Sequence, residues 1–197
     1  MKHLIPDHLL NLLSSNELQP LTIRGKQVLP IVQGGMGVGV SAHKLAGAVA
    51  KLGGVGTISS IDLRRLHPDL MKKTQHLLPS DHSKSVINAA NIEALKREIQ
   101  LAKNESEGNG LIAVNVMRAV KEYTSYVECS LQNGADAIVV GAGLPLDLPD
   151  LAADHPDVAL IPILSESRGI NLVLKKWEKK GRLPDAIVIE NPKWAGG

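Results

Sequence analysis

The sequence predicts an α/β fold built on a parallel sheet. Short, almost continuously apolar segments alternate with longer helical patterns, and in the second half the apolar segments begin roughly every 20 to 30 residues. Aromatic residues make up only 2% of the chain and Phe is absent. Burial must therefore rest on branched aliphatic residues, which dominate strands covered on both faces. Repeated β-α-β units form either an open doubly wound sheet or a barrel.

Strands are predicted at the apolar runs and helices at the segments between them. The predicted strands are 28–33, 54–59, 111–117, 136–141, 158–165 and 185–190. Helical patterns follow at 41–52, 91–103, 119–132 and 169–180, after an amino-terminal helix at 6–13. Ser41 and Asn91 are the expected N-caps. Glycine is expected to end three of these helices, at Gly53, Gly134 and Gly181.

Residues 61–110 interrupt the alternation. At about fifty residues the segment is too long for a plain loop, so it predicts two helices and a turn inserted between the second and third strands. We divide the chain into a helical lead-in, 1–24, and a main domain, 25–197, with the insertion at about 61–110. The histidines of the insertion, His67, His76 and His82, are expected to face solvent.

Composition excludes several classes of function. The net charge is +2 and basic residues are not clustered, so no nucleic-acid partner is expected. No apolar run approaches the roughly 20 residues of a membrane span, and the amino terminus does not resemble a signal peptide. A single cysteine, Cys129, excludes an internal disulfide and suits the cytoplasm. The scattered histidines predict no metal site.

Polar residues recur where buried strands should be apolar. Gln33 ends the first predicted strand before a glycine-rich segment, and Asn115 interrupts the third. The fourth, fifth and sixth strands end at Gly141-Ala142-Gly143, at Ser165 and at Glu190. The carboxyl ends of parallel strands share one edge, where α/β folds bind ligands, so a polar ligand is expected there. Turn formation alone explains single glycines, but it explains neither Asn115 nor Gln33.

The glycine-rich segment admits a second interpretation. Residues 37–42 match the pattern G-x-G-x-x-A after a strand, and Asp62 follows about 20 residues later, as in dinucleotide-binding units. The loop from Gln33 to the predicted helix start at Ser41 is longer than the tight turn of such a unit. The pattern therefore favours a dinucleotide site only weakly.

The stretch PIVQGGMGVGVSAHKLAGAVAKLGGVGTIS resembles the first β-α-β unit of the nitronate monooxygenase family, a unit shared with flavin-dependent enoyl-acyl-carrier-protein reductases. AVNVM, NGADAIVVGAGLP, IPILS and IVIENPKWAGG follow in the order of that family, so the resemblance covers residues 25–197. It implies a TIM barrel, with about six of the eight parallel strands present in this chain, and FMN as the cofactor.

The resemblance also implies which residues hold FMN. The backbone of Gly34, Gly35 and Met36, after Gln33, would lie along the flavin ring, where missing side chains permit close approach. Asn115 would bond the polar edge of the ring, and Gly141, Ala142 and Gly143 would line its pocket. Polar contacts would come from Ser165 and Glu190. The remaining cofactor-binding residues expected from the family are Ala195, Gly196 and Gly197.

The family's catalytic histidine would follow Gly197, so no catalytic residue is assigned within the chain. A complete barrel needs about 250 residues. We therefore expect the sequence to be the amino-terminal part of a longer protein. By itself, this part is expected to retain FMN poorly and to be catalytically inactive.

For the intact protein, the resemblance implies oxidation of small alkyl nitronates with O2 to a carbonyl compound and nitrite. The alternatives are an NAD(P)H-dependent enoyl-thioester reductase and, in another class, a non-catalytic binding module. The expected partners are the small-molecule substrate with O2 or NAD(P)H. The sequence does not decide whether the protein forms a homodimer.

Overall fold

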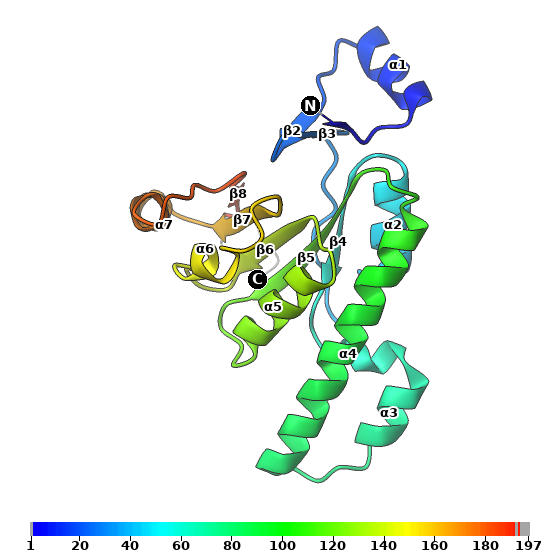
Figure 1. Cartoon of the computed structure of the whole chain (residues 1–197), viewed down its shortest axis with the longest axis vertical. Helices are drawn as coiled ribbons and strands as arrows, with labels where there is room; N and C mark the ends of the chain where they lie inside the picture. Colours follow the sequence, from blue (N-terminus) through cyan, green and yellow to red (C-terminus); the bar gives the residue numbers. More distant parts are fainter. Residues whose placement is uncertain (1, 192, 194–197) are drawn as a thin grey trace.

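A computed structural model describes residues 2–191 and 193 (Figure 1). Its centre is a parallel sheet in which every strand pairs with the next strand along the chain. The strands are β4 (Val55–Ser59), β5 (Leu111–Met117), β6 (Ala137–Gly141), β7 (Ala159–Leu164) and β8 (Val188–Ile189). A doubly wound sheet would reverse its strand order, whereas a barrel keeps the sequential order found here. The fold is α/β, a partial TIM barrel.

The first predicted strand, 28–33, is wrong as a regular strand. Val28 ends a strand of another sheet, and residues 29–33 contribute only one parallel bridge, between Val32 and Val55. The Gln33 N–H donates to the Val55 carbonyl at 2.9 Å, and the Val55 N–H donates to the Ile31 carbonyl at 2.9 Å. The Leu29 N–H also donates to the Gly53 carbonyl at 2.7 Å, so residues 29, 31 and 33 are the ones that face β4. The segment nevertheless follows the edge of β4 as a sixth parallel length of chain.

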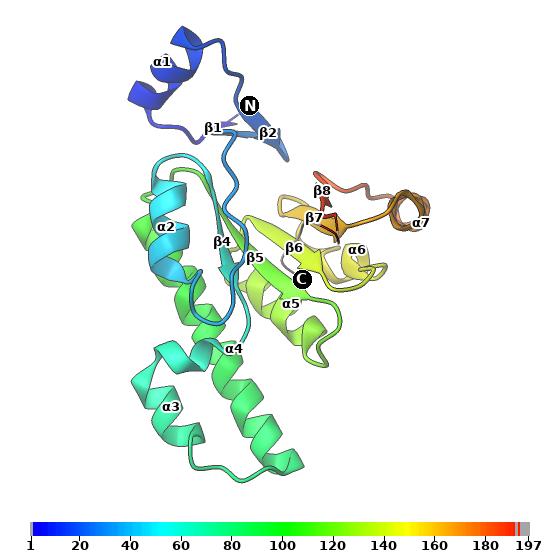
Figure 2. The ribbon, with the colours of Figure 1, turned by 180° about the vertical axis from the view of Figure 1, so that it is seen from behind.

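Helices cover one face of the sheet (Figures 1 and 2). A smaller apolar cluster lies on the other face. The covering helices are α2 (His43–Lys51), α4 (Asp81–Glu105), α5 (Tyr123–Gln132), α6 (Leu148–Leu151) and α7 (Ser167–Glu178). Alternation along β5 directs Ile112 and Val114 toward the helices, whereas Leu111 and Ala113 belong to the inner cluster. Within the described ranges, 2–191 and 193, no helix combines the length and hydrophobicity that a membrane crossing requires.

The insertion between β4 and β5 forms η1 (Leu63–Leu66), α3 (Pro68–Thr74) and the long helix α4. The two helices predicted here are confirmed, but α4 begins ten residues before the expected 91–103, because Ser80 caps it by accepting from the Ser83 N–H at 3.0 Å. Asn91 is therefore not an N-cap and lies inside the helix, where its Oδ1 accepts from the Arg64 N–H at 3.2 Å. Figures 1 and 2 show α3 and the first half of α4 projecting away from the sheet.

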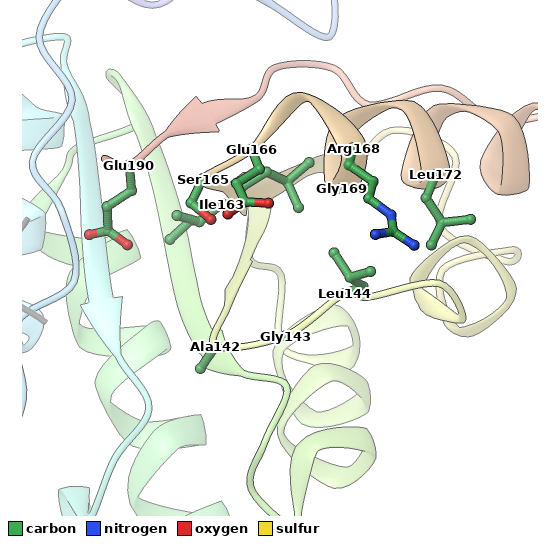
Figure 3. A pocket seen from close by; sticks show the side chains of 11 residues that line it. Ala142, Gly143, Leu144, Ile163, Ser165, Glu166, Arg168, Gly169, Leu172 and Glu190 are labelled. Carbon is green, nitrogen blue, oxygen red and sulfur yellow. The ribbon is translucent and has the colours of Figure 1, made fainter. Parts of the chain in front are cut away.

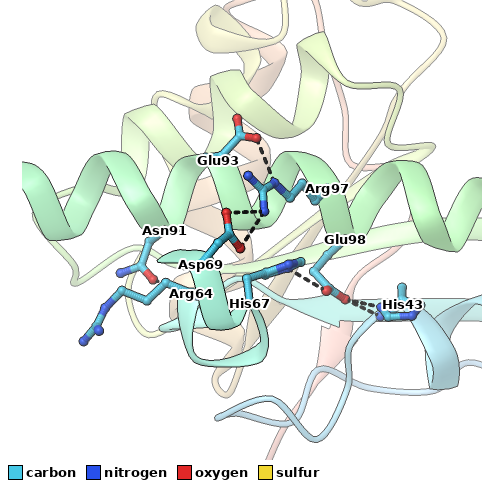
Figure 4. A network of polar contacts seen from close by, with 8 residues as sticks. All are labelled: His43, Arg64, His67, Asp69, Asn91, Glu93, Arg97 and Glu98. Carbon is cyan, nitrogen blue, oxygen red and sulfur yellow. Dashed lines mark hydrogen bonds and ion pairs between the residues drawn. The ribbon is translucent and has the colours of Figure 1, made fainter. Parts of the chain in front are cut away.

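A polar network joins the insertion to the start of α2 (Figure 4). The Glu98 carboxylate of α4 is 1% exposed and accepts from the backbone N–H of His43 at 2.7 Å and pairs with its Nδ1 at 2.8 Å. The other Glu98 oxygen lies 3.0 Å from His67 Nε2. His67 is therefore not a solvent-facing residue as expected, whereas His76 and His82 are exposed. Arg97 pairs with Asp69 of α3 at 3.0 Å in the same region.

The amino-terminal segment contains more than the predicted helix. Besides α1 (Asp7–Ser15), it forms β1 (Lys2–His3), β2 (Leu21–Ile23) and β3 (Lys26–Val28), which make a small sheet of order β1-β3-β2. Strands of two or three residues are too short to show alternation, so the sequence did not indicate them. Leu4, Ile23 and Val28 join the inner cluster of the barrel sheet.

The glycines predicted to end helices are found at helix ends, whereas the residues predicted to cap helix starts are not the caps. Gly53, Gly134 and Gly181 have positive φ values of 90°, 84° and 69°, as expected for residues that end helices. Ser41, by contrast, does not cap α2, whose N-cap is Ala42. The hydroxyl of Ser41 instead accepts from the Met36 N–H at 2.7 Å, within the glycine-rich loop.

Candidate active site

The carboxyl edge of the sheet brings the predicted polar residues together. Asn115 follows Leu111 and Ala113 in the inward-facing row of β5, one step beyond the apolar cluster. In the parallel register it stands beside Ser59 of β4 and Val139 of β6. The next inward position, Met117, is level with Gly141. The inner face is thus apolar along its length and becomes polar where the strands end.

The glycine-rich loop, residues 34–40, is fixed against this edge by Gln33. The Gln33 amide accepts from the Thr57 N–H at 3.0 Å and donates to the Thr57 carbonyl at 3.2 Å, and it also donates to the Gly34 carbonyl. The Gln33 side chain therefore continues, as far as Thr57, the backbone pairing of residues 29–33 with the β4 segment. In this conformation the Gln33 amide is engaged with backbone groups and anchors the loop.

Gly35 lies directly against Asn115. A methyl group built on Gly35 would stand 2.6 Å from Cβ of Asn115, which is closer than side chains approach. At Gly34, the same construction meets nothing within 4 Å. One glycine therefore permits the loop to pack on β5, and the other leaves an open wall beside it.

The Asn115 amide has no hydrogen-bond partner among the residues that the structure describes, and it is half-buried. Neither atom of the amide is among the buried side-chain atoms that lack a partner, so the amide still reaches solvent. A ligand with donors and acceptors at this edge would bond the amide in place of water. This is the observation in the structure that points most directly to a bound polar molecule.

The loop after β6 forms a second wall. The Arg118 N–H donates to the Gly141 carbonyl at 2.8 Å, which continues the β5–β6 pairing by one bond. The chain then turns through two residues with positive φ, Ala142 at 53° and Gly143 at 132°. Both have little or no side chain, so the wall presents backbone to the site.

A pocket of about 620 Å³ lies between this loop and the start of α7 (Figure 3). Four predicted site residues line it, namely Ala142, Gly143, Ser165 and Glu190. Gly141 stands behind it, since a methyl group there would lie 3.2 Å from Cδ1 of the lining residue Ile163. The volume is within the usual range of about 300–1,000 Å³ for small-molecule sites.

The outer part of the pocket carries residues that were not predicted as cofactor ligands. Leu144 and Leu172 form an apolar wall, and Figure 3 shows the Arg168 side chain directed between them. Glu166 precedes α7 and also lines the pocket. Each is ordinary for a loop or a helix start, so only the fold shows that they share one cavity.

Two groups of predicted residues therefore lie along one edge of the sheet, and only the second group lines the pocket. Gly34, Gly35, Met36 and Asn115 lie over β4 and β5, and the pocket residues lie over β6, β7 and β8. Ala195, Gly196 and Gly197 lie outside the described residues. Among residues 2–191 and 193, no three His, Cys, Asp or Glu side chains are grouped as metal ligands.

The alternative dinucleotide site is contradicted by two features. The sheet keeps sequential order and has no point where the strand order reverses, which is where such folds bind the dinucleotide. Asp62, the residue expected to meet a ribose, is paired with Arg64 at 3.0 Å and with Arg65.

Comparison with known proteins decides the family. The family model for nitronate monooxygenase matches residues 20–197. The chain belongs to the nitronate monooxygenase family. The resemblance found in the sequence is thereby confirmed, and with it the assignment to an oxidoreductase family.

Solved structures of FabK share the fold of this nitronate monooxygenase family member at low identity. FabK from Thermotoga maritima superposes with a TM-score of 0.54 and 18% identity over 81% of this chain and 40% of FabK. A point mutant of the same FabK gives 0.54 and 17% over 81% and 42%. Nitroalkane oxidase from Streptomyces ansochromogenes matches with a TM-score of 0.34 and 15% identity, covering 81% and 64%. The chain thus spans less than half the length of FabK. No curated protein sequence matches it.

Proposed function

We propose that this nitronate monooxygenase family member is part of an FMN-dependent enzyme that oxidises small alkyl nitronates with O2 to a carbonyl compound and nitrite. The proposal is supported chiefly by the convergence of Gly35, Asn115 and Gly143 on one edge of the sheet, together with the family match. FMN supplies a two-electron acceptor that reacts with O2 when it is bound.

The residues at this edge fit a flat polar ligand. Asn115 offers an unpartnered amide to the polar edge of a ring, and Gly34 leaves space for its face. Ala142 and Gly143 provide a backbone wall on the neighbouring strand end. These groups would bind and orient the cofactor, while Leu144 and Leu172 would exclude water from the substrate side.

The test is made on the full-length natural protein. We expect about one FMN per chain after purification, and O2 uptake with nitrite release when an alkyl nitronate is added. Purified protein that lacks flavin and cannot be reconstituted with FMN would contradict the proposal.

The enoyl-thioester reductase is the second candidate, favoured by the apolar wall of Leu144, Ile163 and Leu172 in the pocket. Anaerobic mixing with NADPH separates the two. Prompt bleaching of the flavin absorbance indicates the reductase, whereas bleaching by nitronate alone indicates the monooxygenase. Bound flavin that neither reagent reduces would indicate a non-catalytic binding module.

A further inference from the structure

Two loops that border the candidate active site are joined by a charged cluster outside the pocket. Arg118 is the first residue after β5, and Asp147 ends the loop after β6. Arg118 Nη2 lies 3.4 Å from Asp147 Oδ2. The guanidinium carbon of Arg118 also stands 4.6 Å from the centre of the Tyr123 ring, in α5. We call these three residues the loop clamp.

The loop clamp is buried only in part, since the side chains of Arg118 and Asp147 are 40% and 41% exposed. Tyr123 is 2% exposed. The clamp also contains three buried atoms that have no hydrogen-bond partner among the described residues. They are the Tyr123 hydroxyl oxygen, Arg118 Nε and Asp147 Oδ1. Burial, and after it the Asp147 carboxylate, raises the pKa of Tyr123, which keeps the phenol neutral. A buried polar atom without a partner costs free energy, so these three atoms are not explained by stability alone.

The clamp acts on the loop that forms the wall of the site. A methyl group built on Gly143 would lie 3.2 Å from Cβ and from Cγ of Arg118, so the Arg118 stem packs against the loop from behind. Ala142 stands in the left-handed region, which a residue with a side chain keeps only when its surroundings hold it. Arg118 supplies that support through its N–H to the Gly141 carbonyl and through its pairing with Asp147.

We propose that Arg118 and Asp147 are positioning residues, which hold loop 142–147 in the shape that receives the flavin. The inference rests on the proposed function. Neither residue lines the pocket, whereas Ala142, Gly143 and Leu144 of the held loop do. The pair therefore acts through the loop and does not contact the ligand.

The experiment is a double-mutant cycle on FMN affinity in the full-length natural protein. FMN binding to the apoprotein is measured by quenching of flavin fluorescence for Arg118→Met, Asp147→Asn and the double variant. We expect each single variant to bind FMN about tenfold more weakly, and the double variant to be no weaker than either, because each change opens the same clamp. Arg118→Lys keeps the cation and should restore most of the affinity.

Controls separate positioning from folding and from direct contact. Asp150 lies three residues after Asp147 and forms an ion pair with Lys180. Asp150→Asn removes that pair and should leave FMN affinity unchanged. Circular dichroism verifies that every variant is folded at the temperature of the titration. If Arg118→Met does not fold, Asp147→Asn and Arg118→Lys carry the test.

The outcomes are distinct. A weakened Arg118→Met beside an unaffected Asp147→Asn would overturn the clamp in favour of direct ligand contact. Variants that all bind FMN as the wild type does would overturn the clamp alone. A wild-type protein that binds no FMN would overturn the proposed function, and the clamp with it.

Discussion

Asn115 shows how one residue in a buried strand can mark a function. The inward row of β5 is apolar at Leu111 and Ala113 and would stay apolar if the sheet needed only a core. An amide at the next inward position lowers the β-propensity of the strand, and it has no hydrogen-bond partner among the described residues. That combination is expected where a ligand completes the hydrogen bonding.

We therefore predict that Asn115→Leu separates binding from stability. The substitution keeps the shape of the side chain and removes the unpaired amide, so the free energy of unfolding should be unchanged within about 0.5 kcal/mol or should rise. FMN affinity should fall at least about tenfold. Asn91→Leu is the matched control, because its amide accepts from the Arg64 N–H and its loss should cost about 1–3 kcal/mol of stability without changing FMN affinity. Retained FMN affinity in Asn115→Leu would contradict the role given to this amide.

Cys129 permits a prediction about pH. Burial in α5 raises the pKa of this thiol above its ordinary value of 9.0, so the folded state disfavours the thiolate. A folded-state pKa above the unfolded one gives stability that is complete below about pH 9 and is lost as the pH rises further. We expect the native thiol to react with a disulfide reagent at pH 8 much more slowly than in denatured protein. Equal rates in the two states would show that Cys129 is accessible.

Site residues differ in how far the sequence can reveal them. Asn115 and Gly141 were predicted because their residue types are unusual in a buried strand. Arg118, Tyr123 and Asp147 were not, because each is ordinary in its local segment and they meet only through the pairing of β5 with β6. Gln33 was noticed as a polar strand end, but the sequence could not show that its amide pairs with the backbone of Thr57.

Helices and strands were predicted correctly where the local sequence pattern alone determines them, and incorrectly where tertiary contacts decide. The predicted strand 111–117 has the bounds of β5, since six of its seven residues are apolar and Asn115 alone interrupts them. Segment 28–33 has a similar pattern, but Val28 belongs to β3 of the other sheet and residues 29–33 form one bridge with β4. The sequence does not predict the start of α4, because most of residues 81–90 are polar and show no helical apolar pattern. The first turns of α4 are stabilised by the Ser80 cap and by contact with α3, which exist only in the folded chain.

The contact of α2 with β4 gives a prediction at this scale. A methyl group at Gly56 would stand 1.9 Å from the backbone oxygen of Ala46, so the helix lies directly on the strand there. Gly56→Ala must displace α2, and we expect it to lower the free energy of unfolding by about 3 kcal/mol. Gly34→Ala is the matched control, since nothing lies within 4 Å of the added methyl group, and stability should change by less than about 0.5 kcal/mol. Urea denaturation compares the two, and equal stabilities would contradict the close packing.

The whole molecule is organised around a sheet that is closed at one end by its own amino-terminal segment. Ile23 and Val28 of the small sheet enter the inner cluster beneath the strands. Charged residues attach the β2–β3 turn to the barrel, with Arg24 pairing with Asp185 at 3.2 Å and Lys26 with Asp136 at 3.4 Å. The carboxylates of Asp136 and Asp185 also accept from the N–H groups of Ile112 and Leu160, at 2.9 and 2.8 Å. The segment and the sheet thus share a core and a set of ion pairs.

This arrangement predicts that the lead-in and the barrel sheet unfold as one unit. Ile23 is 2% exposed, and Ile23→Ala leaves a cavity inside the shared inner cluster. We expect the free energy of unfolding to fall by about 3 kcal/mol. The shift should be the same when it is followed by far-UV circular dichroism, which reports on all helices, and by tryptophan fluorescence, to which Trp177 in α7 contributes from outside this cluster. Leu12→Ala, at an exposed position of α1, is the control and should leave both signals unchanged. If Ile23→Ala instead splits the denaturation curve, so that the fluorescence midpoint stays at its wild-type value, the amino-terminal segment folds independently of the barrel sheet.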